Sequence, residues 1–242
     1  MVVNRLFCFA QIAGLQHPGC GDHVNDKNLN RPAEPISRDR AVSAAVSLAD
    51  EQGIAGLSMR KLAKSLQIEA MSLYHHVANK DDLLDGMIDS VFAEIELPSL
   101  DLDWKAAMVR RSDSLRFALL RHRWAVGLMD SRSSPGMATL AQHDAMIGCC
   151  RAAGFTIVGA GHALSLIDSY VLGFVLQEVS LPFGPDDDMG EMVDEIVPAE
   201  LLTAFPHLAE LTTELVMQPG YQYGNEFAFG IGLILDGLLA SI

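Results

Sequence analysis

The 242-residue sequence has few cysteines, no long apolar run and little positive charge, and each shortage argues against a class of protein. Its four cysteines, Cys8, Cys20, Cys149 and Cys150, have no spacing typical of a zinc site, and adjacent cysteines seldom bridge each other. We therefore expect reduced thiols in a cytoplasmic protein, with no metal and no cofactor. No run of about 18 apolar residues occurs, and Gln11 interrupts the mildly apolar opening stretch, so neither a membrane span nor a secretion signal is expected.

Catalytic signatures are missing as well. The sequence contains no Gly-x-Ser-x-Gly elbow, no His-Glu-x-x-His motif, no phosphate-cradling glycine-rich loop and no Cys/His nucleophile pairing, and its eight histidines are scattered. We therefore expect a protein that is not an enzyme.

Positive charge is scarce but unevenly distributed. The net charge of −14 is unusual for a nucleic-acid-binding protein, because the DNA backbone favours a basic surface. From Ile36 to Lys80, however, six basic residues outnumber four acidic ones, and since residues 1–35 sum to zero, the rest of the chain carries −16. A weakly basic amino-terminal module is thus joined to a strongly acidic remainder, which would be repelled by DNA and would help to orient the molecule on it.

The apolar periodicity predicts an all-α fold, in which an amino-terminal helix-turn-helix three-helix domain is followed by a helical bundle. We expect a flexible leader over residues 1–35, the helix-turn-helix over 36–80, a ligand-binding and dimerisation domain over 81–242, and a solvated acidic loop from Asp186 to Glu191. The helices that we expect are Ser37 to Gln52, Ser58 to Leu66, about Ala70 to His76, Asn79 towards Pro98, Trp104 to about His122, a short piece from Trp124 to Asp130, Gly136 to Ala153, Val158 to Val179 and Glu226 to Ser241.

Three stretches within residues 36–95 resemble the DNA-binding domain of the TetR family of repressors. They are Leu57-Ser58-Met59-Arg60-Lys61-Leu62-Ala63, Met71-Ser72-Leu73-Tyr74-His75-His76-Val77 and Asn79-Lys80-Asp81-Asp82-Leu83-Leu84. The rest of the chain resembles the regulatory domain of the tetracycline-repressor branch, through Leu120-Arg121-His122-Arg123, Ala152-Ala153-Gly154-Phe155, Asp168 to Phe174 and Phe229 to Gly237. The resemblance implies a repressor that binds a palindromic double-stranded DNA operator as a homodimer and is released by a small-molecule inducer.

In such a module the second short helix enters the major groove, and its exposed side reads base edges while its neighbours hold phosphates. Arg60 matches a family position that can read guanine, and Lys80 lies where it can pair with a phosphate. We expect Leu73 and Val77 to be core. The predicted DNA-binding residues are Ser58, Met59, Arg60, Ala70, Met71, Ser72, Tyr74, His75, His76 and Lys80.

The joint between the two short helices departs from the family pattern. That joint usually carries glycine, because one of its residues has a positive φ, whereas this chain has Gln67. A left-handed glutamine costs on the order of 1 kcal/mol unless another turn geometry replaces it. Ala70 and Met71 are poor hydrogen-bonding residues, so base reading there would depend on apolar contact with thymine methyl groups.

The carboxy-terminal helices contain apolar residues that could enclose a ligand and polar residues that need a partner if they are buried. Most of the apolar residues are expected to be core, and for the polar ones a satisfied hydrogen bond in the core is an equally open interpretation. The predicted ligand-binding residues are Trp104, Phe117, His122, Trp124, Met129, His143, Met146, Asp168, Tyr170, Phe174 and Gln177, with Phe155 as a further interior residue.

In the tetracycline repressors a histidine and a water-linked glutamate hold the magnesium of the drug complex. The resemblance aligns those positions with Met129 and Gln177, which are poor magnesium ligands. Magnesium-tetracycline is therefore not expected to be the inducer.

We expect dimerisation through the helix around Ala163 to Gln177 and the last helix, Phe227 to Ala240, where small residues permit close approach. The inducer would act by moving the fourth helix, Asp81 to about Glu96. An alternative remains open at this point: a helical sensor that has lost DNA binding and acts through protein contacts.

Overall fold

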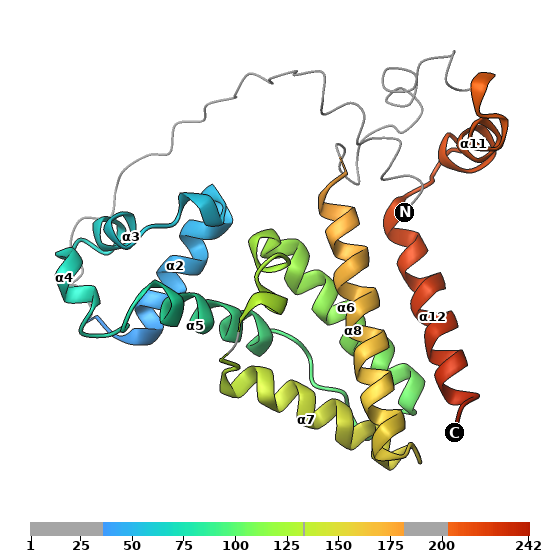
Figure 1. Cartoon of the computed structure of the whole chain (residues 1–242), viewed down its shortest axis with the longest axis horizontal. Coiled ribbons are helices and arrows are strands. Elements are labelled where there is room, and N and C mark those ends of the chain that lie inside the picture. Colours follow the sequence, from blue (N-terminus) through green and yellow to red (C-terminus); the bar gives the residue numbers. More distant parts are fainter. Residues whose placement is uncertain (1–35, 133, 182–202) are drawn as a thin grey trace. The chain divides into compact units, whose positions relative to one another are not determined.

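The computed structural model describes residues 36–132, 134–181 and 203–242 (Figure 1). These residues form helices and turns with no strand among them, as the sequence predicts. They belong to two compact units, of which the larger contains Ile36–Val179 and Phe227–Ile242. The predicted leader over residues 1–35 and the predicted loop from Asp186 to Glu191 lie outside the described residues.

The helices of the larger unit follow the predicted order, with ends that differ by a few residues. They are α2 (Arg38–Gln52), α3 (Met59–Ser65), α4 (Ala70–Leu73), α5 (Lys80–Ala93), α6 (Trp104–Arg121), α7 (Met137–Ala152), α8 (Ile157–Val179) and α12 (Glu226–Leu239), with short 3-10 turns η2 (Ile54–Gly56), η3 (Arg123–Ala125) and η4 (Met129–Ser131).

Three of the predicted helix starts are confirmed by their side-chain caps. Ser37 Oγ accepts a hydrogen bond from the Arg40 N–H at 3.1 Å, and Ser58 Oγ accepts one from the Lys61 N–H at 3.3 Å. The Asn79 side-chain oxygen accepts from the Asp82 N–H at 2.9 Å. Each cap satisfies a backbone donor that the first turn of a helix leaves without an internal partner, which explains why α2, α3 and α5 begin where they do.

The turn that follows α3 contains a residue with a positive φ. Gln67 has φ of 58°, so the predicted left-handed residue is present without glycine. The N–H of Ile68 bonds to the Ala63 carbonyl at 3.0 Å and the N–H of Gln67 bonds to the Lys64 carbonyl at 3.2 Å. These two bonds form a Schellman motif, and they hold the strained residue in place at the joint of the helix-turn-helix.

Helix α5 packs closely on α2 at its start and on α7 further along. A Cβ at Gly86 would lie 2.9 Å from Val42 Cγ2 and 3.1 Å from Arg38 Nη2, so α2 and α5 need glycine at this contact. Asp89 accepts hydrogen bonds from the Thr139 N–H at 2.8 Å and from the Ala138 N–H at 3.3 Å. A side chain of α5 thus caps the beginning of α7.

Helices α6, α7 and α8 pack together around an apolar core. Of the three, α8 has the most large apolar side chains that are exposed, namely Ile157, Val158, Leu166 and Leu176. By length and composition alone α8 could cross a membrane. Its contacts with α6 and α7 and the ion pair between its Asp168 and Arg111 are instead those of a helix in a bundle. Helix α12 contacts α8 through Tyr170, whose hydroxyl donates to the Phe227 carbonyl at 3.1 Å.

The described part of the smaller unit includes a short helical segment that the sequence analysis did not predict. It consists of α11 (Pro206–Leu211), a π-helical turn η5 (Thr212–Val216) and a 3-10 turn η6 (Tyr223–Asn225). Pro206 opens α11, where its missing N–H would have no helical partner in any case.

The left-handed Gln67 generates a prediction about stability. Gln67→Gly should raise the free energy of unfolding by about 0.5–1 kcal/mol, because glycine adopts this backbone conformation without steric cost. Urea unfolding followed by circular dichroism measures the change. Lys64→Gly, in the last turn of α3, is the matched control and should be destabilising, because Lys64 has a helical backbone conformation in which glycine is unfavourable. A Gln67→Gly protein that unfolds at lower urea than the parent would contradict the argument.

Candidate functional site

Two short helices, α3 and α4, form the part of the larger unit that projects furthest from α7 and α8 (Figure 1). Leu62, Ala63, Leu73 and Val77 are buried beneath them, so the prediction that Leu73 and Val77 belong to the core is confirmed. Helix α4 ends at Leu73, earlier than the predicted end near His76, and the chain continues as turns through His76. The short helix is held by packing on α3 rather than by its own length.

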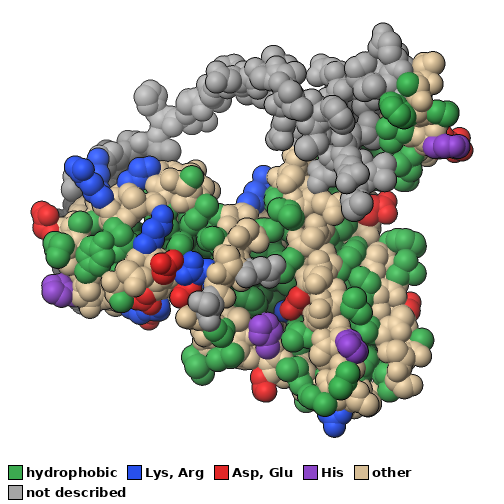
Figure 2. Space-filling model, in the orientation of Figure 1, with side chains coloured by type: hydrophobic (Ala, Val, Ile, Leu, Met, Phe, Trp, Pro, Cys, Tyr) green, Lys and Arg blue, Asp and Glu red, His purple; other side chains and the backbone are tan. Residues whose placement is uncertain are grey.

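The outer surface of this module is formed by residues that the sequence assigned to DNA binding. Arg60, Tyr74, His75 and Lys80 are exposed, and Met71 is 73% exposed although it is apolar. Lysine and arginine side chains lie over the region of α3 in the space-filling view (Figure 2). The remaining predicted DNA-binding residues are exposed or partly exposed, namely Ser58, Met59, Ala70, Ser72 and His76.

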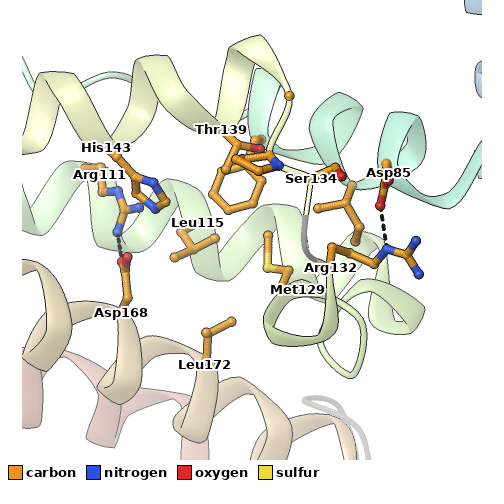
Figure 3. A pocket seen from close by; sticks show the side chains of 14 residues that line it. Asp85, Arg111, Leu115, Met129, Arg132, Ser134, Thr139, His143, Asp168 and Leu172 are labelled. Atoms are coloured by element: carbon orange, nitrogen blue, oxygen red, sulfur yellow. Dashed lines mark hydrogen bonds and ion pairs between the residues drawn. The ribbon is translucent and has the colours of Figure 1, made fainter. Parts of the chain in front are cut away.

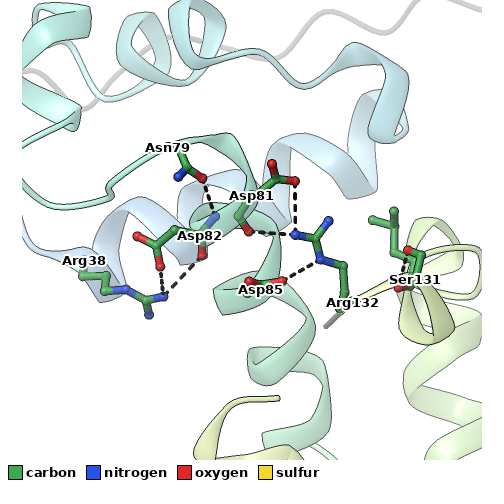
Figure 4. Close-up of polar contacts among 8 residues, drawn as sticks. Arg38, Asn79, Asp81, Asp82, Asp85, Ser131 and Arg132 are labelled. Atoms are coloured by element: carbon green, nitrogen blue, oxygen red, sulfur yellow. Dashed lines mark hydrogen bonds and ion pairs between the residues drawn. The ribbon is translucent and has the colours of Figure 1, made fainter. Parts of the chain in front are cut away.

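Two interactions fix the start of α5 against this module. Lys80 Nζ donates to the Leu57 carbonyl at 3.3 Å, so Lys80 is tied to the residue just before the cap of α3. Arg38 Nη2 lies 2.8 Å from Asp82 Oδ1 (Figure 4). The hydrogen bond from Arg38, followed by one from the Ala78 N–H, lowers the pKa of the Asp82 carboxyl below its usual value.

A cavity of about 210 Å³ lies between α5, α6, α7, α8 and the segment that joins α6 to α7 (Figure 3). Its middle is apolar, with Ile88, Phe92, Leu115, Met129 and Leu172 among its lining residues. Figure 3 shows polar groups at both ends of this apolar middle. One end has Arg111, Asp168 and His143, and the other has Arg132, Asp85 and Ser134.

Three of the residues predicted to bind ligand line this cavity: Met129, His143 and Asp168. The other predicted residues lie elsewhere. Trp104 and Met146 are buried. The Trp104 ring lies 4.7 Å from the Phe155 ring between centroids, and its indole N–H donates to Cys150 Sγ at 3.3 Å. The predictions for these other residues gain no support from the cavity.

Tyr170, Phe174 and Phe227 form an aromatic cluster between α8 and α12, with ring centroids 5.1–5.9 Å apart. The Arg116 guanidinium lies over this cluster and pairs with Glu178.

Gln177 is half-buried on α8 and does not line the cavity. The expectation that Phe117 is an interior residue is wrong, because it points away from the core side of α6 and is 53% exposed.

His122 and Trp124 contact the first helix of the DNA-binding module. Asp50 Oδ1, in the last turn of α2, lies 2.8 Å from His122 Nδ1 and accepts a hydrogen bond from Trp124 Nε1 at 2.6 Å. His122 Nε2 lies 3.0 Å from a carboxylate oxygen of Glu94, at the end of α5. These two side chains therefore join the bundle to α2 and α5, and do not line the cavity.

Sequence reasoning missed two arginines of the cavity. Arg111 falls on the apolar stripe of α6 with Trp104, Met108 and Leu115, and a charged residue on such a stripe was a signal that could have identified it. Arg132 had no such signal. Its Nε lies 2.6 Å from Asp85 Oδ1, and its Nη2 lies 3.2 Å from Asp81 Oδ1 (Figure 4).

The polar groups of the described residues do not form a metal site. No group of three or more His, Cys, Asp and Glu side chains in residues 36–132, 134–181 and 203–242 is placed to hold a metal ion. Cys149 and Cys150 are free and buried, and burial raises the pKa of both thiols. Neither thiol therefore has the exposed, low-pKa environment of a reactive cysteine.

Two family models match the chain. The model for bacterial regulatory proteins of the tetR family covers residues 41–87, and the model for the tetracyclin repressor-like carboxy-terminal domain covers residues 97–242. An HTH-type transcriptional regulator of Saccharopolyspora erythraea is 42% identical over 147 residues, which are 59% of this chain and 61% of that protein. The HTH-type transcriptional repressor DrrR1 of Streptomyces coeruleorubidus is 31% identical over 216 residues, 86% of this chain and 78% of the repressor.

Solved structures of regulators also superpose on this chain. The TetR family protein ActR of Streptomyces coelicolor, in complex with actinorhodin, superposes with a TM-score of 0.72 at 28% identity, over 86% of this chain and 99% of ActR. BioQ with its natural double-stranded DNA operator superposes with a TM-score of 0.61 at 25% identity, over 85% and 99% of the two chains. The chain is therefore a member of the TetR family, a DNA-binding transcriptional repressor with a ligand-responsive carboxy-terminal domain, and not an enzyme.

Proposed function

We propose that this repressor binds a palindromic operator as a homodimer, through the surface that contains Arg60, Tyr74, His75 and Lys80, and that a small molecule in the cavity of the bundle releases it. The observation that carries the proposal is the presence of both parts in one compact unit: an exposed helix-turn-helix and a partly polar cavity, with α5 shared between them. BioQ with its operator and ActR with actinorhodin support the same two binding activities.

The exposed groups of the helix-turn-helix suit DNA. Arg60, near the start of α3, can donate two hydrogen bonds to the edge of a guanine, whereas Lys80 provides a point charge for a phosphate at the start of α5. Met71 is an exposed apolar side chain at the start of the second short helix, where contact with a thymine methyl group would shield it from water. The surface thus combines base-reading and phosphate-binding groups.

Exposed apolar side chains on α8 and α12 favour a homodimer. Phe229 and Leu233 are 68% and 59% exposed, four residues apart on one face of α12, and Leu166 of α8 is also largely exposed. At Gly173 and Gly232 no atom from elsewhere in the described residues lies within 4 Å of the position of a Cβ, so a second copy can approach both helices closely. Apolar helix faces of this kind pack against their copies in a symmetric interface.

Two contacts offer a route from the cavity to the DNA-binding module. Arg132 lines the cavity and binds Asp81 and Asp85 in the first turns of α5, directly after Lys80. His122 and Trp124, which follow the carboxy-terminal end of α6, bind Asp50 of α2. A ligand that is bound more tightly in one arrangement of these contacts than in another would change the separation of the two DNA-binding modules of a dimer.

Selection of bound fragments from random DNA should recover an inverted repeat, and the recovered duplex then tests the proposed contacts. Arg60→Ala should weaken binding by about 1–3 kcal/mol and relax the preference at one base of each half-site. Lys80→Ala should weaken binding to all duplexes and reduce the slope of log affinity against log salt by about one for each lysine removed. Fluorescence anisotropy over a range of salt concentrations measures both effects.

Arg110→Ala is the matched control, because Arg110 is exposed, pairs with Glu96 and lies on α6, outside the helix-turn-helix. It removes the same charge and should leave the affinity and the salt slope close to those of the parent. If the protein bound no duplex at low salt, the proposal would fail, and a sensor that acts through protein contacts would become the better explanation.

The dimer interface can be tested separately. Phe229→Asp combined with Leu233→Asp should give a monomer in sedimentation velocity, since a buried charge without a partner strongly opposes association. Affinity for the recovered operator should fall with it, because both half-sites must be bound together. Leu100→Asp, at an exposed leucine between α5 and α6, is the control and should remain dimeric. A double variant that stayed dimeric would show that α12 is not the interface.

Magnesium-tetracycline should not bind with micromolar affinity. Met129 lines the cavity where a magnesium ligand would be needed, and Gln177 does not line it. Titration calorimetry with tetracycline and excess Mg²⁺ measures this directly, with a tetracycline repressor protein as the positive control. Binding in the micromolar range would prove the prediction wrong.

A further inference from the structure

Arg111 is buried at one end of the cavity with part of its guanidinium lacking a partner. Its side chain has 0% exposure and its Nη1 pairs with Asp168 (Figure 3). Its Nε and Nη2 are also buried, and they have no hydrogen-bond acceptor among the described residues. Buried guanidinium donors without an acceptor are costly, so this pair of nitrogens needs an acceptor that the described residues do not provide.

Arg116, on the same helix, uses the corresponding pair of nitrogens, Nε and Nη2, to bind a carboxylate. Its Nε donates to one oxygen of Glu178 at 2.8 Å while its Nη2 donates to the other oxygen. The two parallel bonds fit the two oxygens of one carboxylate. Arg111 is among the residues that line the apolar cavity, its Nη1 is occupied by Asp168, and the same two nitrogens, Nε and Nη2, have no acceptor among the described residues.

The size and lining of the cavity limit the rest of the ligand. A cavity of about 150 Å³ with apolar walls accommodates a molecule of the size of benzene, and this one measures about 210 Å³. Its middle is formed by Leu115, Met129 and Leu172 with Phe92 and Ile88, so an apolar ring fits between the two polar ends.

We propose that the ligand is an organic carboxylate with one or two rings, whose carboxylate is bound by Nε and Nη2 of Arg111 and whose rings fill the apolar middle of the cavity. The inference depends on the proposed ligand-responsive function and specifies the chemical class of its ligand. His143, which lines the same end, lies beside the expected position of the carboxylate.

Titration calorimetry on the full chain, without DNA, tests the chemical class with defined probes. Benzoate and 2-naphthoate are compared with benzamide and 2-naphthamide, which have the same shape without the charge. The parent protein should bind at least one of the two carboxylates about tenfold or more tightly than its amide. Equal binding of acid and amide, or no binding of either carboxylate at millimolar concentration, would overturn the proposal.

Two variants and one control distinguish this role of Arg111 from a structural one. Arg111→Gln should abolish the preference for the carboxylate, and Arg110→Gln, at the exposed neighbouring arginine, should leave it unchanged. Asp168→Asn should strengthen carboxylate binding several-fold, because it removes a negative charge beside the guanidinium while its amide oxygen can still accept from Nη1. A merely structural arginine would give no such gain. If Arg111→Gln does not fold, the acid and amide comparison in the parent and in Asp168→Asn still decides the outcome.

The same preparations are tested for binding to the operator recovered from random DNA. Operator binding without any preference for the carboxylate would overturn the ligand class and leave the proposed repressor function intact. A carboxylate preference in a protein that bound no duplex would have the opposite meaning, since the ligand class would stand while the proposed operator binding failed.

Discussion

The larger unit depends on the carboxylates of one helix, α5, which bind partners from three other elements. Asp82 holds Arg38 of α2, Asp85 holds Arg132, and Asp89 caps the first turn of α7. Positions three and four residues apart share one side of a helix, so a single side of α5 collects these bonds. Because each of these carboxylates binds a different element, a shift of α5 would exchange at least one of these bonds.

This constraint connects the two activities of the molecule. The first turn of α5 continues directly from the helix-turn-helix, and its middle contributes Asp85, Ile88 and Phe92 to the cavity wall. A ligand that changes the width of the cavity therefore acts on the helix that carries the DNA-binding module. Induction requires only that the ligand prefer one of two positions of α5, and the energy available is the difference between its two affinities.

Local rules were enough to predict the helix-turn-helix from the sequence, and tertiary contacts explain what was missed. Ser37, Ser58 and Asn79 act on donors within three residues, and the strain at Gln67 also depends on neighbouring residues alone, so the sequence contains their whole environment. Arg132 and Asp85 are 47 residues apart, and no periodicity relates them. His122 was correctly identified as a polar group in need of a partner, whereas Trp124 was predicted only as a residue of the apolar interior. Only the folded chain reveals that both side chains contact Asp50, on another helix.

The adjacent arginines of α6 show why a buried charge is informative. Arg110 lies on the surface and pairs with Glu96, whereas Arg111 is turned by one residue, about 100° around the helix, into the core. An apolar residue of similar volume at this position would avoid the cost of desolvating a guanidinium, and replacing buried ion pairs by apolar groups is often neutral or stabilising. The guanidinium of Arg111 has five donor hydrogens, and its partner among the described residues is the single carboxylate of Asp168. A contribution to stability therefore does not explain why this position is an arginine. Its position in the cavity wall provides a better reason, because a preformed guanidinium edge can recognise a ligand that an apolar wall could not distinguish.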